Sequence, residues 1–288
     1  MTLQVFNATI RPMTMMVVDD DEMPILPDGF PARGRRAGGP IDIRVELRDA
    51  PYPIWRHFTI TQYGTLTDLH YTIQSAMGWL DYHMHEFTVA GATFAPSTVE
   101  TVHVQRPKRV LRTERLEYDE DLVELSRHLT RGQQFVYEYD FGDRWVHDCT
   151  VTRVHSGGML LGGPVLIDGA GDCPVEDSGG VAGYAAKLMQ LQELTARQKA
   201  TGRPWRDVAI PGHDDELVRW WYSWGEPTPF TIAGQQEAMY RQWSGSDAEE
   251  DDDAEENYLY VEEGEGGLPT DLTTLNVPAV SDEYLDRV

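Results

Sequence analysis

The chain has 288 residues, 41% of them hydrophobic and 10% aromatic, which is enough to bury a core in one large domain or two small ones. Its formal net charge of −24 at pH 7 disfavours direct binding to nucleic acid, because such binding requires Lys and Arg to neutralise phosphates. No apolar run is long enough to span a membrane, and Asp19 to Glu22 stand where a signal peptide needs apolar residues. With only Cys149 and Cys173, too few for a disulfide framework, we expect a cytoplasmic protein without a membrane partner.

The N-terminal part of the folded region shows a change of pattern at residue 41. Residues 1–40 mix an acidic cluster with a loop rich in Pro, Gly and Arg, and we expect a mobile leader. Strict alternation of apolar and charged residues over 41–47 predicts a half-buried strand, and 55–60 predicts a second one. Thr65 can cap a helix whose apolar residues through Met77 share one side, with Gly78 near its end.

The rest of the chain continues with mixed elements. Residues 85–90 predict a strand, and Asp119 is expected to begin a short helix that ends at Gly132. The remaining expected elements are a hairpin over 134–154 with its turn at 141–144, a loop from 157 to 180, and helices over 184–194, 214–224 and 232–243.

These elements predict an α+β fold. It combines a small mixed sheet, made of a β-β-α-β unit and a hairpin, with covering helices and a helical C-terminal part. We expect one domain over 41–243 and an acidic, largely disordered tail over 244–288, because 247–265 carries eleven acids and no base. The remainder still holds 48 − 11 = 37 acids against 24 bases.

The first polar motif lies around His83, His85 and Glu86. If residues 83–87 are extended, both histidines share one face with Phe87, and Glu86 points to the other. Two imidazoles at this spacing can ligate one metal ion, and the alternative is that they are structural or surface residues.

The second motif is the hairpin with Asp140 at its turn. Alternation along its second strand places Asp143, Trp145, His147 and Cys149 on one face, which could form half of a metal site. The alternative is a hairpin in which Asp140 or Asp143 bonds the turn backbone and Trp145 packs in the core.

The third motif runs from Cys173 through Glu176 and Asp177 to a Gly-Gly pair at 179–180. It could be a rigid loop that presents ligands, or a helix entry at which Asp177 or Ser178 caps the backbone. Cys173 could instead pair with a histidine as a nucleophile.

Five strings, in this order, resemble the plasmid pRiA4b open-reading-frame-three-like family, whose members are also described as passenger proteins of insertion elements. The matching strings are Trp55-Arg56, the segment from Leu66 to Trp79, His85-Glu86-Phe87, the segment from Tyr139 to Asp143 with Trp145 and His147, and the segment from Cys173 to Gly180. The resemblance covers about residues 41–243 and implies a compact α+β fold linked to plasmids or mobile elements. It implies no activity. Ser178 stands where the family often has a second Cys, which weakens any proposal that needs two thiols.

Two functional hypotheses follow from these motifs. One is a protein-interaction module with a composite polar pocket and a protein partner. The other is a metal-dependent hydrolase or another acid/base enzyme that uses the same pocket, with a divalent metal as its cofactor. The pocket residues are His85, Glu86, Asp140, Asp143, Trp145, His147, Cys173, Glu176 and Asp177; the catalytic candidates are Asp143, His147 and Glu176; the candidate metal ligands are His83, His85 and His147.

Two spatial expectations make the composite pocket testable. His85, Asp143 and His147 should come together across neighbouring strands. The loop that begins at Cys173 should pack against the hairpin between Asp140 and His147, because unpaired polar groups are costly to bury.

Overall fold

The structure, a computed structural model, describes residues 26–27, 30, 39–61, 63–96, 117–160, 162–222, 229–244 and 268–288. Most of the expected leader and the acidic segment over 247–265 lie outside these residues. Within the described part of the chain, no helix combines the length and the apolarity needed to cross a membrane.

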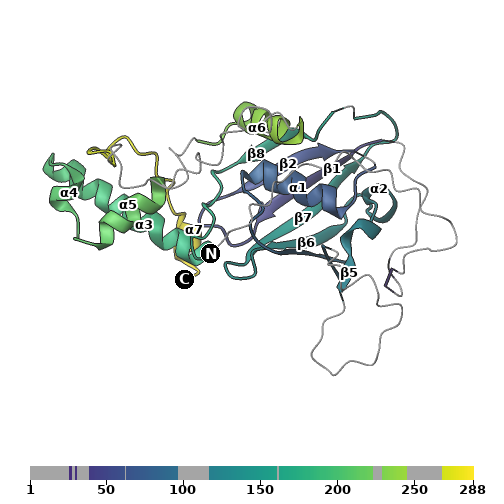
Figure 1. Ribbon diagram of the computed structural model, residues 1–288, viewed down its shortest axis with the longest axis horizontal. Coiled ribbons are helices and arrows are strands. Elements are labelled where there is room, and N and C mark those ends of the chain that lie inside the picture. The colour runs from purple at the N-terminus through teal and green to yellow at the C-terminus, as the bar shows by residue number, and fades with distance from the viewer. Residues whose placement is uncertain are drawn as a thin grey trace, which may run out of the picture.

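An eight-stranded sheet forms the body of the protein, in the order β5-β4-β3-β6-β7-β1-β2-β8 (Figure 1). Neighbouring strands are antiparallel except β4 and β5, which are parallel. The strands are β1 (Ile41–Leu47), β2 (Trp55–Ile60), β3 (His85–Val89), β4 (Ala92–Ala95), β5 (Glu117–Asp119), β6 (Gln134–Tyr139), β7 (Trp145–Val154) and β8 (Val165–Ala170).

One face of the sheet is covered by α1 (Leu66–Met77), which lies across it in Figure 1. Thr65 begins this helix with a capping box: its hydroxyl accepts from the Asp68 backbone N–H, and the Asp68 carboxylate accepts from the Thr65 backbone N–H. Gly78 ends the helix in the left-handed conformation, with φ of 83°. The predicted cap, helix and end are therefore confirmed.

The core lies between α1 and the sheet. Alternate residues of β1 and β2 are fully buried there, including Ile43, Val45 and Phe58. The other face of β1 and β2 carries polar pairs, such as Thr59 with Asp42 and His57 with Thr152. A sheet that is apolar on one side and polar on the other explains the strict alternation in the sequence.

Strands β4, β5 and β8 were not expected, and one helix differs from its expectation. Residues 165–170, expected to be loop, form β8 at the edge of the sheet beside β2. The helix expected to begin at Asp119 and end at Gly132 is broken into the short η2 (Glu120–Leu122) and α2 (Leu125–His128). The break occurs because Glu124 pairs with Thr65 as a β-bridge, and the backbone N–H of Leu125 donates to the Gly64 carbonyl. Pairing with the loop before α1 replaces the intrahelical bonds.

The helical C-terminal part projects beyond one end of the sheet in Figure 1. It consists of α3 (Gly180–Thr201), α4 (Trp205–Val208) and α5 (His213–Tyr222), while α6 (Ile232–Ser244) returns to pack on α1 and β8. The α+β fold with a helical C-terminal part is confirmed, although the sheet is larger than the sequence indicates.

Residues 268–288, the end of the range expected to be an acidic, largely disordered tail, pack against the rest of the described protein. Leu272 is fully buried and its backbone N–H donates to the Gln198 side chain of α3. The short α7 (Asp282–Leu285) follows, and the N–H of Ser281 donates to the Pro51 carbonyl beside β1. The last residues therefore join the helical part to the sheet.

Candidate functional site

Three chain segments meet at one end of β3, β6 and β7. They are residues 79–84 between α1 and β3, the turn at 140–144 between β6 and β7, and the loop at 173–179 before α3. Strand register brings them together, since His85 is opposite Tyr139 and Tyr139 is opposite Trp145. The order of the strands thus gathers motifs that are about ninety residues apart in the sequence.

The loop before α3 packs on the hairpin through backbone and carboxylate contacts. The Asp143 carboxylate accepts from the Gly179 N–H at 2.8 Å. Gly180, with φ of 68°, passes so close that an added Cβ would collide with the Asp143 carbonyl oxygen. The indole N–H of Trp79 donates to the Pro174 carbonyl at 2.9 Å.

Glu176 is the centre of this junction. Its carboxylate accepts from the Tyr139 hydroxyl at 2.5 Å and from the Leu80 backbone N–H at 3.0 Å. Burial raises the pKa of Glu176, while these two donors oppose the shift. Burial and the adjacent Glu176 carboxylate raise the pKa of Tyr139, so its hydroxyl stays protonated and donates. Glu176 therefore fixes one segment against the other two.

Cys173 faces a different set of residues from the rest of its loop. The Arg56 guanidinium donates to its sulfur at 3.0 Å, and the Met77 sulfur lies 3.1 Å away. Burial raises the pKa of the Cys173 thiol even though Arg56 opposes the shift. The thiol is thus protonated at neutral pH, which does not support a nucleophilic role.

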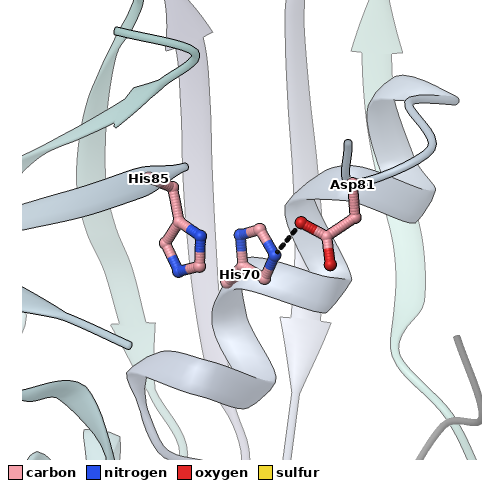
Figure 2. A group of neighbouring side chains, drawn as sticks. All are labelled: His70, Asp81 and His85. Carbon is pink, nitrogen blue, oxygen red and sulfur yellow. Dashed lines mark hydrogen bonds and ion pairs between the residues drawn. The ribbon is translucent and has the colours of Figure 1, made fainter. Parts of the chain in front are cut away.

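A buried histidine group, consisting of His70, Asp81, His85, Glu120 and Tyr137, lies between α1 and the sheet. Figure 2 shows His70 between Asp81 and His85. The two imidazoles are stacked with centroids 3.5 Å apart and planes at 5°. His70 contacts the Tyr137 hydroxyl through Nδ1 at 2.8 Å and Asp81 through Nε2 at 2.9 Å, and His85 Nε2 lies 2.9 Å from Glu120.

The charge state of the buried histidine group follows from its surroundings. Burial lowers the pKa of His70, and the neighbouring His85 lowers it further, against the opposing effect of Asp81. A neutral His70 can donate to Asp81 from Nε2 and accept the Tyr137 hydroxyl at Nδ1. Gln74 also donates to that hydroxyl, so the group is a hydrogen-bond network that joins α1 to β3 and β6.

A second group, which we call the surface ligand group, consists of His83, Asp140 and Asp177. One nitrogen or oxygen atom from each lies within 4.8 Å of the others. His83 Nε2 is 3.3 Å from Asp177 Oδ1 and 3.7 Å from Asp140 Oδ2. This nitrogen is shielded from solvent and has no hydrogen-bond partner among the described residues. The three side chains come one from each of the three segments.

Asp140 is oriented by the turn that contains it. Its Oδ1 accepts from the backbone N–H groups of Gly142 at 2.9 Å and Asp143 at 3.3 Å, which leaves Oδ2 directed to His83. Asp140 and Asp177 both have left-handed backbones, with φ of 57° and 56°, a conformation that Asp tolerates better than most residues. The turn chemistry expected for Asp140 is therefore present together with its contact to His83.

His147 and Trp145 are core residues of β7. His147 is fully buried, with its ring 5.4 Å from Trp79 and 5.5 Å from Tyr137, and neither ring nitrogen has a hydrogen-bond partner among the described residues. Burial lowers the pKa of His147 to about 4, so the imidazole is neutral. It cannot exchange protons with solvent from this position without a structural opening.

The structure brings together only some of the residues that the sequence grouped. His83, His85 and His147 form no common ligand set in the described chain, because β3 begins only at His85 and His83 precedes it. His85 and His147 lie on one face but on either side of Tyr137. Asp143 belongs to the turn rather than to β7, so strand alternation does not apply to it. Glu86 is buried on the opposite face, opposite Glu138.

Several residues of the site were absent from the sequence prediction. His70 and Gln74 lie on the apolar side of α1, four and eight residues after Leu66, a spacing that indicates a core-facing position. Tyr137 and Tyr139 alternate with Glu138 on β6 and are fully buried. Helical and strand periodicity could have predicted these positions, because it places the polar residues on a face that is otherwise apolar and buried.

All three segments of the site lie within the part of the chain that a family model matches. The model of the family described as "Plasmid pRiA4b ORF-3-like protein" matches residues 40–217. The "Uncharacterized protein y4hQ" of Sinorhizobium fredii is 34% identical over 165 residues, which are 57% of this chain and 79% of that protein. A crystal structure of a protein of unknown function, MM3350 from Methanosarcina mazei Go1, aligns with a TM-score of 0.52 and 22% identity, covering 69% of this chain and 98% of that one. That likeness supports the fold alone.

Proposed function

Because the chain belongs to the plasmid pRiA4b ORF-3-like protein family, and its rhizobial relative is itself uncharacterized, we propose a function from its own geometry: it is a protein-interaction module. Its recognition surface is the junction of the three segments that carry His83, Asp140 and Asp177. The partner is a protein segment that carries apolar side chains next to basic ones.

The observation that carries this proposal is an apolar rim, formed by Leu80, Tyr82, Met84 and Phe141. These side chains are between 40% and 54% exposed. All four come from the two segments that also supply His83 and Asp140, and the backbone N–H of Asp140 donates to the Met84 carbonyl at 2.9 Å. Exposed apolar residues on segments that also carry polar groups are a common feature of interaction sites.

The backbone under the rim is held in place. The N–H of Tyr82 donates to the Tyr139 hydroxyl at 3.0 Å, and the N–H of Leu80 donates to Glu176. A surface that is already ordered loses little conformational entropy when a partner binds. This favours recognition by the rim in the conformation that the protein already has.

The charge of the protein determines the chemistry of the partner. A net charge of −24 attracts basic segments over a long range and accelerates their association. The same charge repels nucleic acid, so the proposal includes no direct contact with DNA or RNA. Apolar anchors on the rim would then supply most of the binding free energy.

The candidate catalytic residues support binding rather than hydrolysis. Asp143 is bonded to the Gly179 N–H, Glu176 is held between Leu80 and Tyr139, and His147 is enclosed in the core. Hydrolysis by activated water needs such groups within reach of one accessible water. The three are engaged in separate structural contacts.

Selection of a random peptide library displayed on phage tests the proposal. We expect the enriched peptides to contain an aromatic or aliphatic residue flanked by Lys or Arg, and to bind more weakly as salt increases. Tyr82→Ser and Phe141→Ser should each weaken binding at least tenfold. Tyr240→Ser and Met159→Ser, which change equally exposed residues outside the rim, should not. Acidic consensus peptides, or binding that is insensitive to the rim variants, would refute the proposal.

A further inference from the structure

We propose that the surface ligand group binds a first-row transition-metal dication, with Zn²⁺ and Mn²⁺ as its representatives. His83, Asp140 and Asp177 are the protein ligands. This inference does not depend on the proposed interaction function, because metal binding is measurable without any partner.

The separations of the three ligand atoms match those around a metal ion. Metal–ligand distances of about 2.0 to 2.2 Å place neighbouring ligand atoms about 3.0 to 3.5 Å apart in octahedral or tetrahedral coordination. His83 Nε2 lies 3.3 Å from Asp177 Oδ1 and 3.7 Å from Asp140 Oδ2, and the whole set falls within 4.8 Å. The two distances from the imidazole nitrogen to the carboxylates therefore lie within a few tenths of an ångström of this range.

The nitrogen at the centre of the set is in an otherwise unfavourable position. His83 Nε2 is shielded from solvent, yet no described residue offers it a hydrogen bond. A shielded polar atom without a partner costs free energy, and a bound cation would remove that cost. The nitrogen lies 3.3 Å and 3.7 Å from oxygens of two carboxylates, and carboxylates join imidazoles as ligands of zinc and manganese ions.

The surroundings of the two carboxylates also favour a cation. Asp140 Oδ1 accepts hydrogen bonds from two backbone N–H groups, and these bonds fix the orientation of Oδ2. Hydrogen bonds of this kind commonly orient the carboxylates that bind metal ions. Lys187, the nearby ammonium, is engaged with the Ser178 carbonyl at 2.9 Å and with the Trp220 ring. These contacts already engage the ammonium, and its charge also acts on Asp177.

The buried histidine group offers similar residue types but does not suit a metal in this arrangement. Both nitrogens of His70 and Nε2 of His85 already have hydrogen-bond partners. Lone pairs of imidazoles lie in the ring planes, and the planes of His70 and His85 are nearly parallel (Figure 2). Their lone pairs therefore do not converge on one point.

A metal at the surface ligand group would join the three segments of the site. It would connect the loop before β3, the turn between β6 and β7 and the loop before α3 by bonds stronger than the present contacts. Three protein ligands leave further positions for water, as in zinc sites that are open to exchange. The backbone that supports the apolar rim would become more rigid as a result.

Isothermal titration calorimetry on the full chain, without a polyhistidine tag, tests the inference with ZnCl₂ and MnCl₂. We expect one Zn²⁺ per chain and weaker Mn²⁺ binding, following the usual order of affinities. His83→Ala, Asp140→Asn and Asp177→Asn should each weaken Zn²⁺ binding at least tenfold. Asn tolerates the left-handed backbone at both aspartate positions, and circular dichroism checks the fold.

His155→Ala is the matched control, since His155 is also a partly exposed histidine beside a carboxylate, Asp42, but has no second carboxylate beside it among the described residues. It should leave Zn²⁺ binding unchanged, as should Phe141→Ser in the apolar rim. Wild-type protein that binds neither metal would overturn the inference. So would Zn²⁺ binding that survives His83→Ala but is lost on His85→Gln, because the ligands would then be in the buried histidine group.

Discussion

His83 and His85 are two residues apart, yet they belong to groups with opposite physical character. The buried histidine group around His85 is enclosed, and its polar atoms are paired with one another. The surface ligand group around His83 is partly exposed, and its imidazole nitrogen has no hydrogen-bond partner in the described residues. Histidine and carboxylate side chains thus stabilise the fold in the buried histidine group. In the surface ligand group they leave an imidazole nitrogen that can bind a ligand.

The position of each histidine relative to β3 creates this difference. His85 is the first residue of the strand, so the sheet and α1 enclose its side chain. His83 precedes the strand, and its imidazole lies beside Asp140 of the turn and Asp177 of the loop. The contrast shows why a His-x-His spacing alone does not define a metal site.

The largest effect is expected for His85→Leu. Glu120 is buried and accepts from His85, so the substitution leaves a buried carboxylate without this donor and should lower the free energy of unfolding by about 4 kcal/mol. His83→Leu should change it by less than about 1 kcal/mol, as is usual for a partly exposed residue. Urea unfolding of both variants at pH 7 measures the difference. Equal losses would show that the two groups are not distinct in this way.

The buried His147 should make the free energy of unfolding depend on pH. Its folded pKa of about 4 lies below the ordinary value of 6.5, so its contribution is complete above pH 6.5 and is lost as the pH falls toward 4. That contribution amounts to about 3 kcal/mol over the window. His147→Leu should therefore lose about 3 kcal/mol less stability than wild type between pH 7 and pH 4. Parallel slopes for the two proteins in urea unfolding would contradict the assignment.

The sequence predicts regular elements well where one face is apolar. The alternation over 41–47 and the capped helix after Thr65 correspond to β1 and α1. Edge strand β8 was missed because glycines at 162, 163, 169 and 171 and Pro164 resemble a loop, although its backbone pairs with β2. Residues 268–288 also gave no periodic signal, although Leu268, Leu272 and Tyr284 are buried.

The sequence predicted the members of the site better than their grouping. Asp140, Glu176 and Asp177 do come together with His83, because strand order brings the turn and the loop beside β3. Asp143 and Cys173 have other partners, Gly179 and Arg56. Tertiary contacts decide which side-chain atoms remain without a hydrogen-bond partner. The spacing of the histidines along the chain therefore could not show that His83 and His85 belong to different groups.

The central claim is that the buried histidine group stabilises the fold, whereas the surface ligand group binds a divalent metal ion. Urea unfolding of wild type, His83→Ala and Tyr137→Phe, each with and without Zn²⁺, tests it most directly. Zn²⁺ at a hundred times its Kd should add about 3 kcal/mol to wild type. His83→Ala should keep the metal-free stability and lose this increment. Tyr137→Phe, which removes a hydroxyl bonded to His70 and Gln74, should lose about 1 to 2 kcal/mol and keep the full increment. An increment that persists in His83→Ala, or disappears in Tyr137→Phe, would contradict the account.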